Sequence, residues 1–378
     1  MGNKTKKIAV VLAGAVAKGA FEAGALQALA RTDVEILRIV AASSGALTGT
    51  VLASAVAAGQ LVEGADRIAE IWRDHARLRE VFHLSVRDLV KRNGLSDQKQ
   101  LMALLRRHVP LTPTAHPVSL RLVVAPLAGR DHEIVTRTET RTATSFEAVR
   151  DFHAGHFESQ DGLDAVLSAA VASAAFPLVF APVQLHRDGR CIDGGCVNNT
   201  PLKWALEGHI GAQIDAVVVI ATSVEHRKDP PGSLTGLRAL TGHLAGMLLD
   251  ERLYRDLREA EQVNRALDRL DQLVRDKVIT DEQLHRVKHA LHWSGRRQVD
   301  IVTIRPDKPL DGGAFSGFFR RKKRVQYVNA GLGRGLDVLA QARWPRRPEG
   351  PSVRHDDVVA GAVDPVELPG PVERDRPE

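Results

Sequence analysis

The chain has 378 residues, of which 44% are hydrophobic, and a formal net charge of +6. This length and apolar content allow a sizeable buried core and exclude a disordered or fibrous protein. Two cysteines, Cys191 and Cys196, are too few for a disulfide-built scaffold or a cysteine-based metal cluster. A reducing compartment is the simpler assumption, and the two thiols are interpreted as small side chains that fill loop space.

Residues 1–17 combine a basic start, a short apolar run and a small-residue end. This pattern is typical of a secretory signal peptide, and equally of a buried first strand with its turn. We favour the strand, because cleavage near Ala17 would remove a loop that belongs to the site described below, although secretion stays open. No apolar run is long enough to span a bilayer. The expectation is a cytoplasmic protein, with peripheral membrane contact as an option.

The first half of the chain alternates short apolar runs with helical patterns. Strands are predicted at 7–12 and 35–40, each followed by a turn of small residues and a helix, and the second helix ends at Gly59. Residues 61–108 are expected to be helical, with Ser96 and Asp97 placed to cap the segment 98–108. Two strands joined near Gly129 occupy 119–139, and a polar loop region continues to Gln160.

The second half begins with a small-residue helix at 161–176 that Pro177 stops. A hairpin at 183–195 turns at Asp188-Gly189, a helix at 198–209 carries Pro201 near its first turn, and 214–223 is the clearest buried strand. Long charged helices follow at 234–293, then a strand at 299–306 and a final helix at 325–343. Alternating strands and helices predict the α/β class.

Three segments are expected along the chain. Residues 1–230 form the catalytic α/β core, and 231–344 add a helical extension plus the last strand and helix that complete this core. Residues 345–378 are rich in proline and charge and poor in aromatics, which predicts a disordered tail.

The segment Ala41-Ala42-Ser43-Ser44-Gly45 lies where the second strand meets its helix. A sharp strand-to-helix turn exposes a serine Oγ and requires the spacing small-x-Ser-x-Gly. Ser43 satisfies this spacing, whereas centring the motif on Ser44 would require a glycine at position 46. Ser43 is therefore the predicted nucleophile, and the backbone N–H of Ser44 can point at a developing oxyanion. The alternative is that both serines only cap the helix.

Three further motifs accompany this serine. The turn Gly14–Gly19 opens a helix, so its N–H groups can converge on an anion. Asp193-Gly194-Gly195 places a carboxylate just after a strand. The passage 172–177, ASAAFP, leads from a small-residue helix into the loop before that aspartate.

In this order and spacing, the four motifs resemble those of the patatin-like phospholipases, over about residues 7–224. The resemblance implies a three-layer α/β fold with a mostly parallel central sheet flanked by helices, and lipid acyl hydrolysis without metal or organic cofactor. It further implies a Ser–Asp dyad of Ser43 and Asp193, with oxyanion donors in the turn at Gly14, Ala15 and Val16. Supporting positions in the same motifs are Lys18, Gly19, Gly45, Gly194, Gly195, Asn199 and Pro201.

The chain departs from the family pattern at three positions. Ala15 and Val16 replace two glycines of the turn, and Ala41 replaces the first glycine of the serine motif. Backbone N–H groups do not depend on the side chain, but a positive φ at position 16 would strain a β-branched valine. The favoured function is a phospholipase A-type hydrolase acting at a membrane surface. A soluble carboxylesterase or thioesterase, and a catalytically impaired lipid-binding or regulatory protein, are the alternatives.

A cluster of aromatic and basic residues near the C-terminus suggests how the protein meets a membrane. Such a cluster suits an anionic bilayer, each basic residue contributing about 1 kcal/mol. It consists of Phe315, Phe318, Phe319, Arg320, Arg321, Lys322, Lys323 and Arg324. The alternative is a loop whose phenylalanines pack on the core and whose charges are solvated.

Two other kinds of partner are not expected. No nucleic-acid module surrounds the basic cluster. His285, His289 and His292 share one face of a predicted helix, which we interpret as a solvated face rather than a metal site.

Overall fold

The computed structural model describes residues 5–84, 96–135, 140–177, 179–224, 237–291, 293, 297–344 and 347. Residues up to Arg346 form one compact unit. The tail expected at 345–378 lies outside the described residues apart from Arg347, so its disorder stays a prediction.

A mixed sheet forms the centre of this unit, and its strand order among the described residues is β12-β11-β1-β2-β5-β10-β9, with β8 also paired to β5. β12, β11, β1, β2 and β5 are parallel to their neighbours in that order, whereas β8, β9 and β10 run antiparallel. The bounds are β1 (Lys6–Leu12), β2 (Val34–Ala41), β5 (Ser119–Pro126), β8 (Ala148–His153), β9 (Val183–Leu185), β10 (Gly189–Asp193), β11 (Ala216–Ile220) and β12 (Asp300–Ile304).

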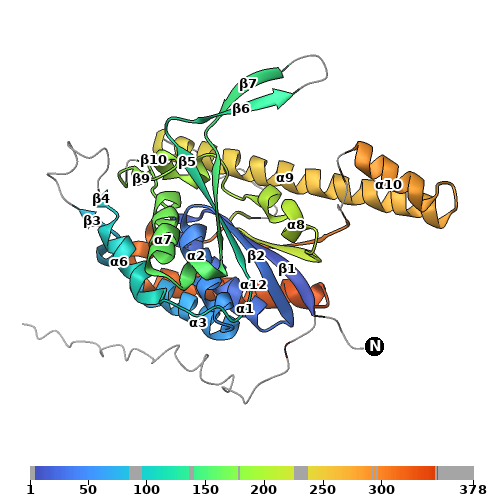
Figure 1. The fold of residues 1–378 in the computed structure, drawn as a ribbon. Helices are drawn as coiled ribbons and strands as arrows, with labels where there is room; N and C mark the ends of the chain where they lie inside the picture. Colours follow the sequence, from blue (N-terminus) through green and yellow to red (C-terminus); the bar gives the residue numbers. More distant parts are fainter. Residues whose placement is uncertain are drawn as a thin grey trace, which may run out of the picture. The chain divides into compact units, whose positions relative to one another are not determined.

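Helices cover both faces of the sheet, which gives the expected three layers (Figure 1). The larger helices are α1 (Ala20–Ala30), α2 (Ser44–Ala57), α3 (Leu61–Glu70), α6 (Lys99–His108), α7 (Gln160–Ser173), α9 (Leu237–Arg275), α10 (Asp281–Ala290) and α12 (Arg321–Gln341). Ile8, Val10 and Leu12 of β1 point into the core shared with α1, α2, α7 and α12. Ala9 and Val11, one residue out of phase, pack on the other face in the cluster that contains Leu253 of α9.

Several elements differ from the sequence-based expectations. The loop region expected before Gln160 contains β8 and also β7 (Thr140–Ser145), which pairs with β6 (Arg130–Val135) in a separate two-stranded sheet. β7 is polar apart from Ala143, so it carries no apolar alternation to reveal a strand. The helical stretch expected at 61–108 is interrupted by a π-helical turn, η2 (Ile71–His75), by α4 (Leu78–Val81), and by β3 (His83–Leu84) paired with β4 (Ser96–Asp97).

The start of α12, the capping role of Ser96 and one helix were also predicted wrongly, whereas the capping role of Asp97 is confirmed. α12 begins at Arg321, four residues earlier than expected. Asp97 accepts a hydrogen bond from the Lys99 N–H at the start of α6, but Ser96 lies in β4 and donates to the Asp97 carbonyl instead. The helix expected at 198–209 is replaced by a short 3-10 helix, η5 (Leu202–Ala205), and a single turn, α8 (Gly208–Gly211). Arg38 accounts for part of this difference, because its guanidinium donates to the carbonyls of Trp204, Ala205 and Glu207. An α-helix over 198–209 would use the first two of these carbonyls for its own hydrogen bonds.

Helices α1 and α12 pack with their backbones in contact, which requires glycine on both helices. A Cβ at Gly24 would overlap the Val328 carbonyl, and a Cβ at Gly331 would overlap the Phe21 carbonyl. This close contact anchors α12 beside the turn that precedes α1.

Replacing Gly331 by Ala should lower the free energy of unfolding by about 1–3 kcal/mol, because the added methyl group forces the two helices apart. Gly333, two residues along the same helix, has open space where its Cβ would lie. Gly333→Ala should therefore be neutral, or stabilising by up to about 1 kcal/mol through helix propensity. Urea unfolding of the two variants measures the difference, and equal effects would contradict the packing described.

Candidate active site

The register of three strands brings Ser43 and Asp193 together although 150 residues separate them in the chain. β2 pairs with β5 so that Ala41 lies opposite Leu122. On the other side of β5, Asp193 at the end of β10 lies opposite Val124, two residues further on. Ser43 comes two residues after Ala41, so it reaches the same level as Asp193.

Ser43 adopts the strained backbone expected of a serine at a strand-to-helix turn. Its φ is +54° and its ψ is −132°, directly before α2 begins at Ser44. A positive φ at a non-glycine residue costs on the order of 1–3 kcal/mol, so surrounding contacts have to hold it. The Ser43 N–H donates to Ser173 Oγ at 3.0 Å, and Ser173 in turn donates to the Val123 carbonyl at 2.6 Å. The sequence pattern singles out the segment around Ser173 but does not predict that Ser173 holds the backbone of Ser43. The signal that could have indicated it is a single serine in a run of alanines.

The Ser43 hydroxyl donates to Asp193 Oδ2 at 2.7 Å. The other carboxylate oxygen, Oδ1, accepts the Gly195 N–H at 2.7 Å. The Asp193 residue is only 1% exposed. Burial raises the pKa of Asp193 to about 7, and the hydrogen bonds from Ser43 and Gly195 oppose this increase. The carboxylate is therefore a stronger base than an ordinary aspartate, whose pKa lies near 4.

The turn after β1 lies directly against this pair. A Cβ at Gly14 would lie 2.6 Å from Ser43 Cβ and would overlap the Asn199 amide. Gly14 and Asn199 also exchange two hydrogen bonds, Gly14 N–H to the Asn199 carbonyl at 3.0 Å and Asn199 Nδ2 to the Gly14 carbonyl at 2.9 Å. Asn199 thus fixes the turn beside the serine.

The backbone N–H groups of the turn differ in their availability. The Gly14 N–H is used by Asn199, and the Ala15 N–H donates to Ser44 Oγ at 2.9 Å. Among the described residues, nothing accepts a hydrogen bond from the N–H of Val16 or of Ser44. Of the four residues that the sequence offers as oxyanion donors, two therefore have a free N–H next to Ser43.

Val16 does adopt the conformation that glycine would favour, with a φ of +52°. A β-branched residue is strained there, and two contacts of its neighbour Ala17 hold the turn in place. The Ala17 N–H donates to the Ala314 carbonyl at 3.1 Å, and a Cβ at Gly317 would lie 3.0 Å from Ala17 Cβ. Ala41, which also departs from the family pattern, is accommodated by Gly49 of α2. A Cβ at Gly49 would lie 3.2 Å from the Cβ of Ala41.

The remaining supporting glycines allow close packing around the pair. At Gly19, an added Cβ would lie 2.7 Å from the Trp72 ring, and at Gly45 it would lie 2.6 Å from the Leu12 carbonyl. At Gly194, it would overlap the Val123 carbonyl. Lys18 is half-buried in η1 (Val16–Gly19).

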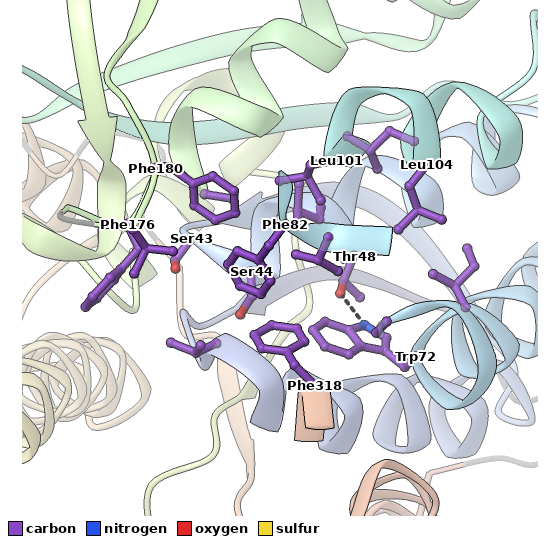
Figure 2. A pocket seen from close by; sticks show the side chains of 18 of the residues that line it. Ser43, Ser44, Thr48, Trp72, Phe82, Leu101, Leu104, Phe176, Phe180 and Phe318 are labelled. Carbon is purple, nitrogen blue, oxygen red and sulfur yellow. Dashed lines mark hydrogen bonds between the residues drawn. The ribbon is translucent and has the colours of Figure 1, made fainter. Parts of the chain in front are cut away.

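A cavity opens from Ser43 and Asp193 into an apolar interior. In Figure 2, Ser43 lies at one end and Leu104 of α6 at the other, with Phe82 and Phe318 between them. His108 also lines the cavity, but burial lowers its pKa and so favours the neutral imidazole. The lining is that of a site for an apolar chain, with the polar pair at one end.

The aromatic and basic cluster divides into buried and exposed members, so the expectation that all eight residues face a membrane is wrong. Phe318 is 8% exposed and belongs to the cavity wall. Arg324 is 2% exposed, and its guanidinium donates to the carbonyls of Arg73 and Gly317. It thereby ties α12 to η2 and to the short helix α11 (Ser316–Phe319). Phe315 and Lys323 are partly buried, and the exposed members are Phe319, Arg320, Arg321 and Lys322.

The other residues singled out in the sequence lie away from this site. His285 and His289 are exposed on α10, and His292 lies outside the described residues. In the part of the chain that the structure describes, no three His, Cys, Asp or Glu side chains are arranged to hold a metal ion. Cys191 is buried in a small core cluster and Cys196 is exposed. No helix of the described residues is long and apolar enough to cross a bilayer.

The profile of the patatin-like phospholipase family matches residues 10–206, more than half of the chain. The chain therefore belongs to the patatin-like phospholipase family. This confirms the resemblance drawn from the four motifs and the α/β fold with its mostly parallel sheet. Membership indicates hydrolysis of lipid acyl esters.

Two solved structures are similar to the chain at low overall scores. VipD from Legionella pneumophila matches with 14% identity and a TM-score of 0.36, over 90% of this chain and 67% of that one. Full-length ExoU, in complex with SpcU from the type III secretion system of Pseudomonas aeruginosa, matches with 16% identity and a TM-score of 0.26. The match covers 90% of this chain and 77% of that one. Similarity at this level supports no inference about function. No curated protein matches the sequence significantly.

Replacing Asp193 by Asn should stabilise the fold at neutral and higher pH. The pKa of Asp193 is about 7 in the folded protein, whereas an unfolded aspartate titrates near 4. Between these values the unfolded chain releases the proton while the folded protein keeps it, so the wild type loses stability as pH rises from about 4 to about 7. The difference in Tm between Asp193→Asn and wild type should grow across this window and then level off.

The matched control is Asp161→Asn, which changes an exposed aspartate in the first turn of α7. Its difference from wild type should stay nearly constant over the same pH range. A constant difference for Asp193→Asn as well would contradict the raised pKa.

Proposed function

We propose that the protein is a phospholipase A-type hydrolase that uses Ser43 as nucleophile and Asp193 as its base, without a histidine. The observation that supports this most directly is the 2.7 Å hydrogen bond from Ser43 Oγ to a buried carboxylate whose pKa is raised to about 7. A base needs to lie within hydrogen-bonding reach of the proton it accepts, with a pKa near the working pH.

In this mechanism Ser43 Oγ attacks the carbonyl carbon of a lipid ester while its proton moves to Asp193. The tetrahedral intermediate collapses to an acyl-enzyme, and the proton leaves with the alcohol of the ester. Asp193 then accepts a proton from the water that attacks the acyl-enzyme, and it returns this proton to Ser43 Oγ as the fatty acid leaves. The free N–H groups of Val16 and Ser44 are the proposed donors to the oxyanion, since those of Gly14 and Ala15 already have acceptors.

The apolar cavity takes the acyl chain in this proposal. Its walls of leucine, isoleucine and phenylalanine exclude water, and Ser43 lies at one end, where the ester carbon would sit. The exposed part of the aromatic and basic cluster, which follows the wall residue Phe318 in the chain, is the proposed membrane contact.

Replacing Ser43 by Ala should reduce fatty-acid release from phospholipid vesicles by more than about a thousandfold, because no nucleophile remains. Ser54→Ala, which removes a hydroxyl from the same helix away from the cavity, should retain activity. Equal release by wild type and Ser43→Ala would overturn the enzyme proposal and favour the lipid-binding alternative. Release from soluble short-chain esters alone would instead favour the soluble esterase or thioesterase.

Replacing Leu104 by Trp should shorten the acyl chains that the protein accepts, because Leu104 lies at the end of the cavity opposite Ser43 (Figure 2). We expect the ratio of kcat/KM for palmitoyl to butyryl esters to fall by about tenfold or more, in line with the energies of apolar pocket contacts. Leu111→Trp, at a half-exposed position just after α6, should leave this ratio unchanged. An unchanged ratio for Leu104→Trp would place the acyl chain elsewhere.

A further inference from the structure

A second hollow lies beside α11 and apart from Ser43 and Asp193. Its lining combines cations, a hydroxyl and an aromatic ring: Asp311, Gly312, Ser316, Phe319, Arg320 and Lys323. This lining shares no residue with that of the acyl cavity.

The polar groups of the hollow suit a phosphate. Lys323 forms an ion pair with Asp311, which lowers the pKa of that carboxyl group and keeps it charged. Within the described part of the chain, Arg320 has no carboxylate in salt-bridge distance, so the lining carries one positive charge in excess. Gly312 has a φ of +92°, and a Cβ there would lie 2.8 Å from Ser316 Oγ. The missing side chain leaves the hydroxyl open to the hollow.

An exposed aromatic side chain borders the same hollow. Phe319 is 66% exposed, although a buried position would be favoured by about 1.5–3 kcal/mol. Arg321 and Lys322, which follow Arg320 in the chain, are also exposed. Phenylalanine together with lysine and arginine is typical of segments that lie in the headgroup region of a bilayer.

The short helix α11 separates the hollow from the acyl cavity. Phe318 contributes to the cavity wall, and the next residue, Phe319, lines the hollow. The segment before α11 is joined to the turn beside Ser43 through the hydrogen bond from the Ala17 N–H to the Ala314 carbonyl. A membrane bound at the hollow would therefore lie next to the wall of the acyl cavity.

We propose that this hollow binds the phosphate headgroup of an anionic phospholipid in a bilayer, while Phe319 inserts between neighbouring lipids. The site is a docking site, distinct from the cavity that takes the acyl chain, and its use in catalysis rests on the function proposed above. The excess positive charge and the exposed ring together favour a lipid in a membrane over a free anion, because a soluble phosphate gains nothing from Phe319.

The test measures membrane binding in the Ser43→Ala protein, so that hydrolysis plays no part in the result. Co-sedimentation with phosphatidylcholine vesicles containing phosphatidylglycerol should exceed that with pure phosphatidylcholine vesicles by at least fivefold. Arg320→Ser should weaken the first binding by about fivefold, and Phe319→Ser by about tenfold or more. The control variants Tyr254→Ser and Arg286→Ser remove an exposed aromatic ring on α9 and an exposed cation on α10, and should bind like the parent.

Thermal unfolding of each variant verifies that its fold is retained. Equal binding of the parent and the variants Phe319→Ser and Arg320→Ser would overturn the proposal, as would equal binding to neutral and anionic vesicles. Release by inorganic phosphate, beyond that by chloride at matched ionic strength, combined with parent-like binding of Phe319→Ser, would assign the hollow to a soluble anion and also overturn it. Because binding is measured without Ser43, a failure of the proposed dyad leaves these outcomes unchanged.

Discussion

The contact between the Ser43 hydroxyl and the Asp193 carboxylate requires three backbone segments to approach one another closely, and the surrounding structure allows this. The two residues come from strands on opposite sides of β5, and the turn after β1 has to pass directly over them. There is no room for a Cβ at Gly14 or Gly194, where it would overlap Asn199 and the Val123 carbonyl. Residues without side chains are therefore needed where three backbone segments converge, while alanine suffices at position 41 because Gly49 faces it.

The same burial acts on the site in two opposing ways. Removing the Asp193 carboxylate from water raises its pKa to about 7, which strengthens it as a base but makes its charged form costly to the fold. Ser43 and Val16 add backbone strain at positive φ. Stability given up at these residues is offset elsewhere, in the apolar core on both sheet faces and in the close contact between α1 and α12.

Much of the fold could be predicted because buried parallel strands are continuous apolar runs, as in β1 and β11. The site could be predicted because Ser43 lies between a buried strand and the helix after it, and because Asp193 ends the second strand of a hairpin. Features that depend on tertiary contacts could not. A run of five basic residues looks solvated in sequence, yet Arg324 is buried because two backbone carbonyls accept its hydrogen bonds. Nothing in the sequence tells that the Ala15 N–H is used by Ser44, or that Arg38 donates to three carbonyls of the segment 198–209.

The hydrogen bond from the Ala17 N–H to the Ala314 carbonyl joins a turn near the start of the chain to a segment almost 300 residues later. Phe315 and Phe318, in that late segment, also close part of the apolar cavity beside Ser43. During synthesis, the serine and its aspartate leave the ribosome long before this wall exists. A nascent chain thus carries Ser43 and Asp193 without the complete cavity, and in the function proposed above lipid cleavage begins only after the segment that contains α11 and α12 has docked.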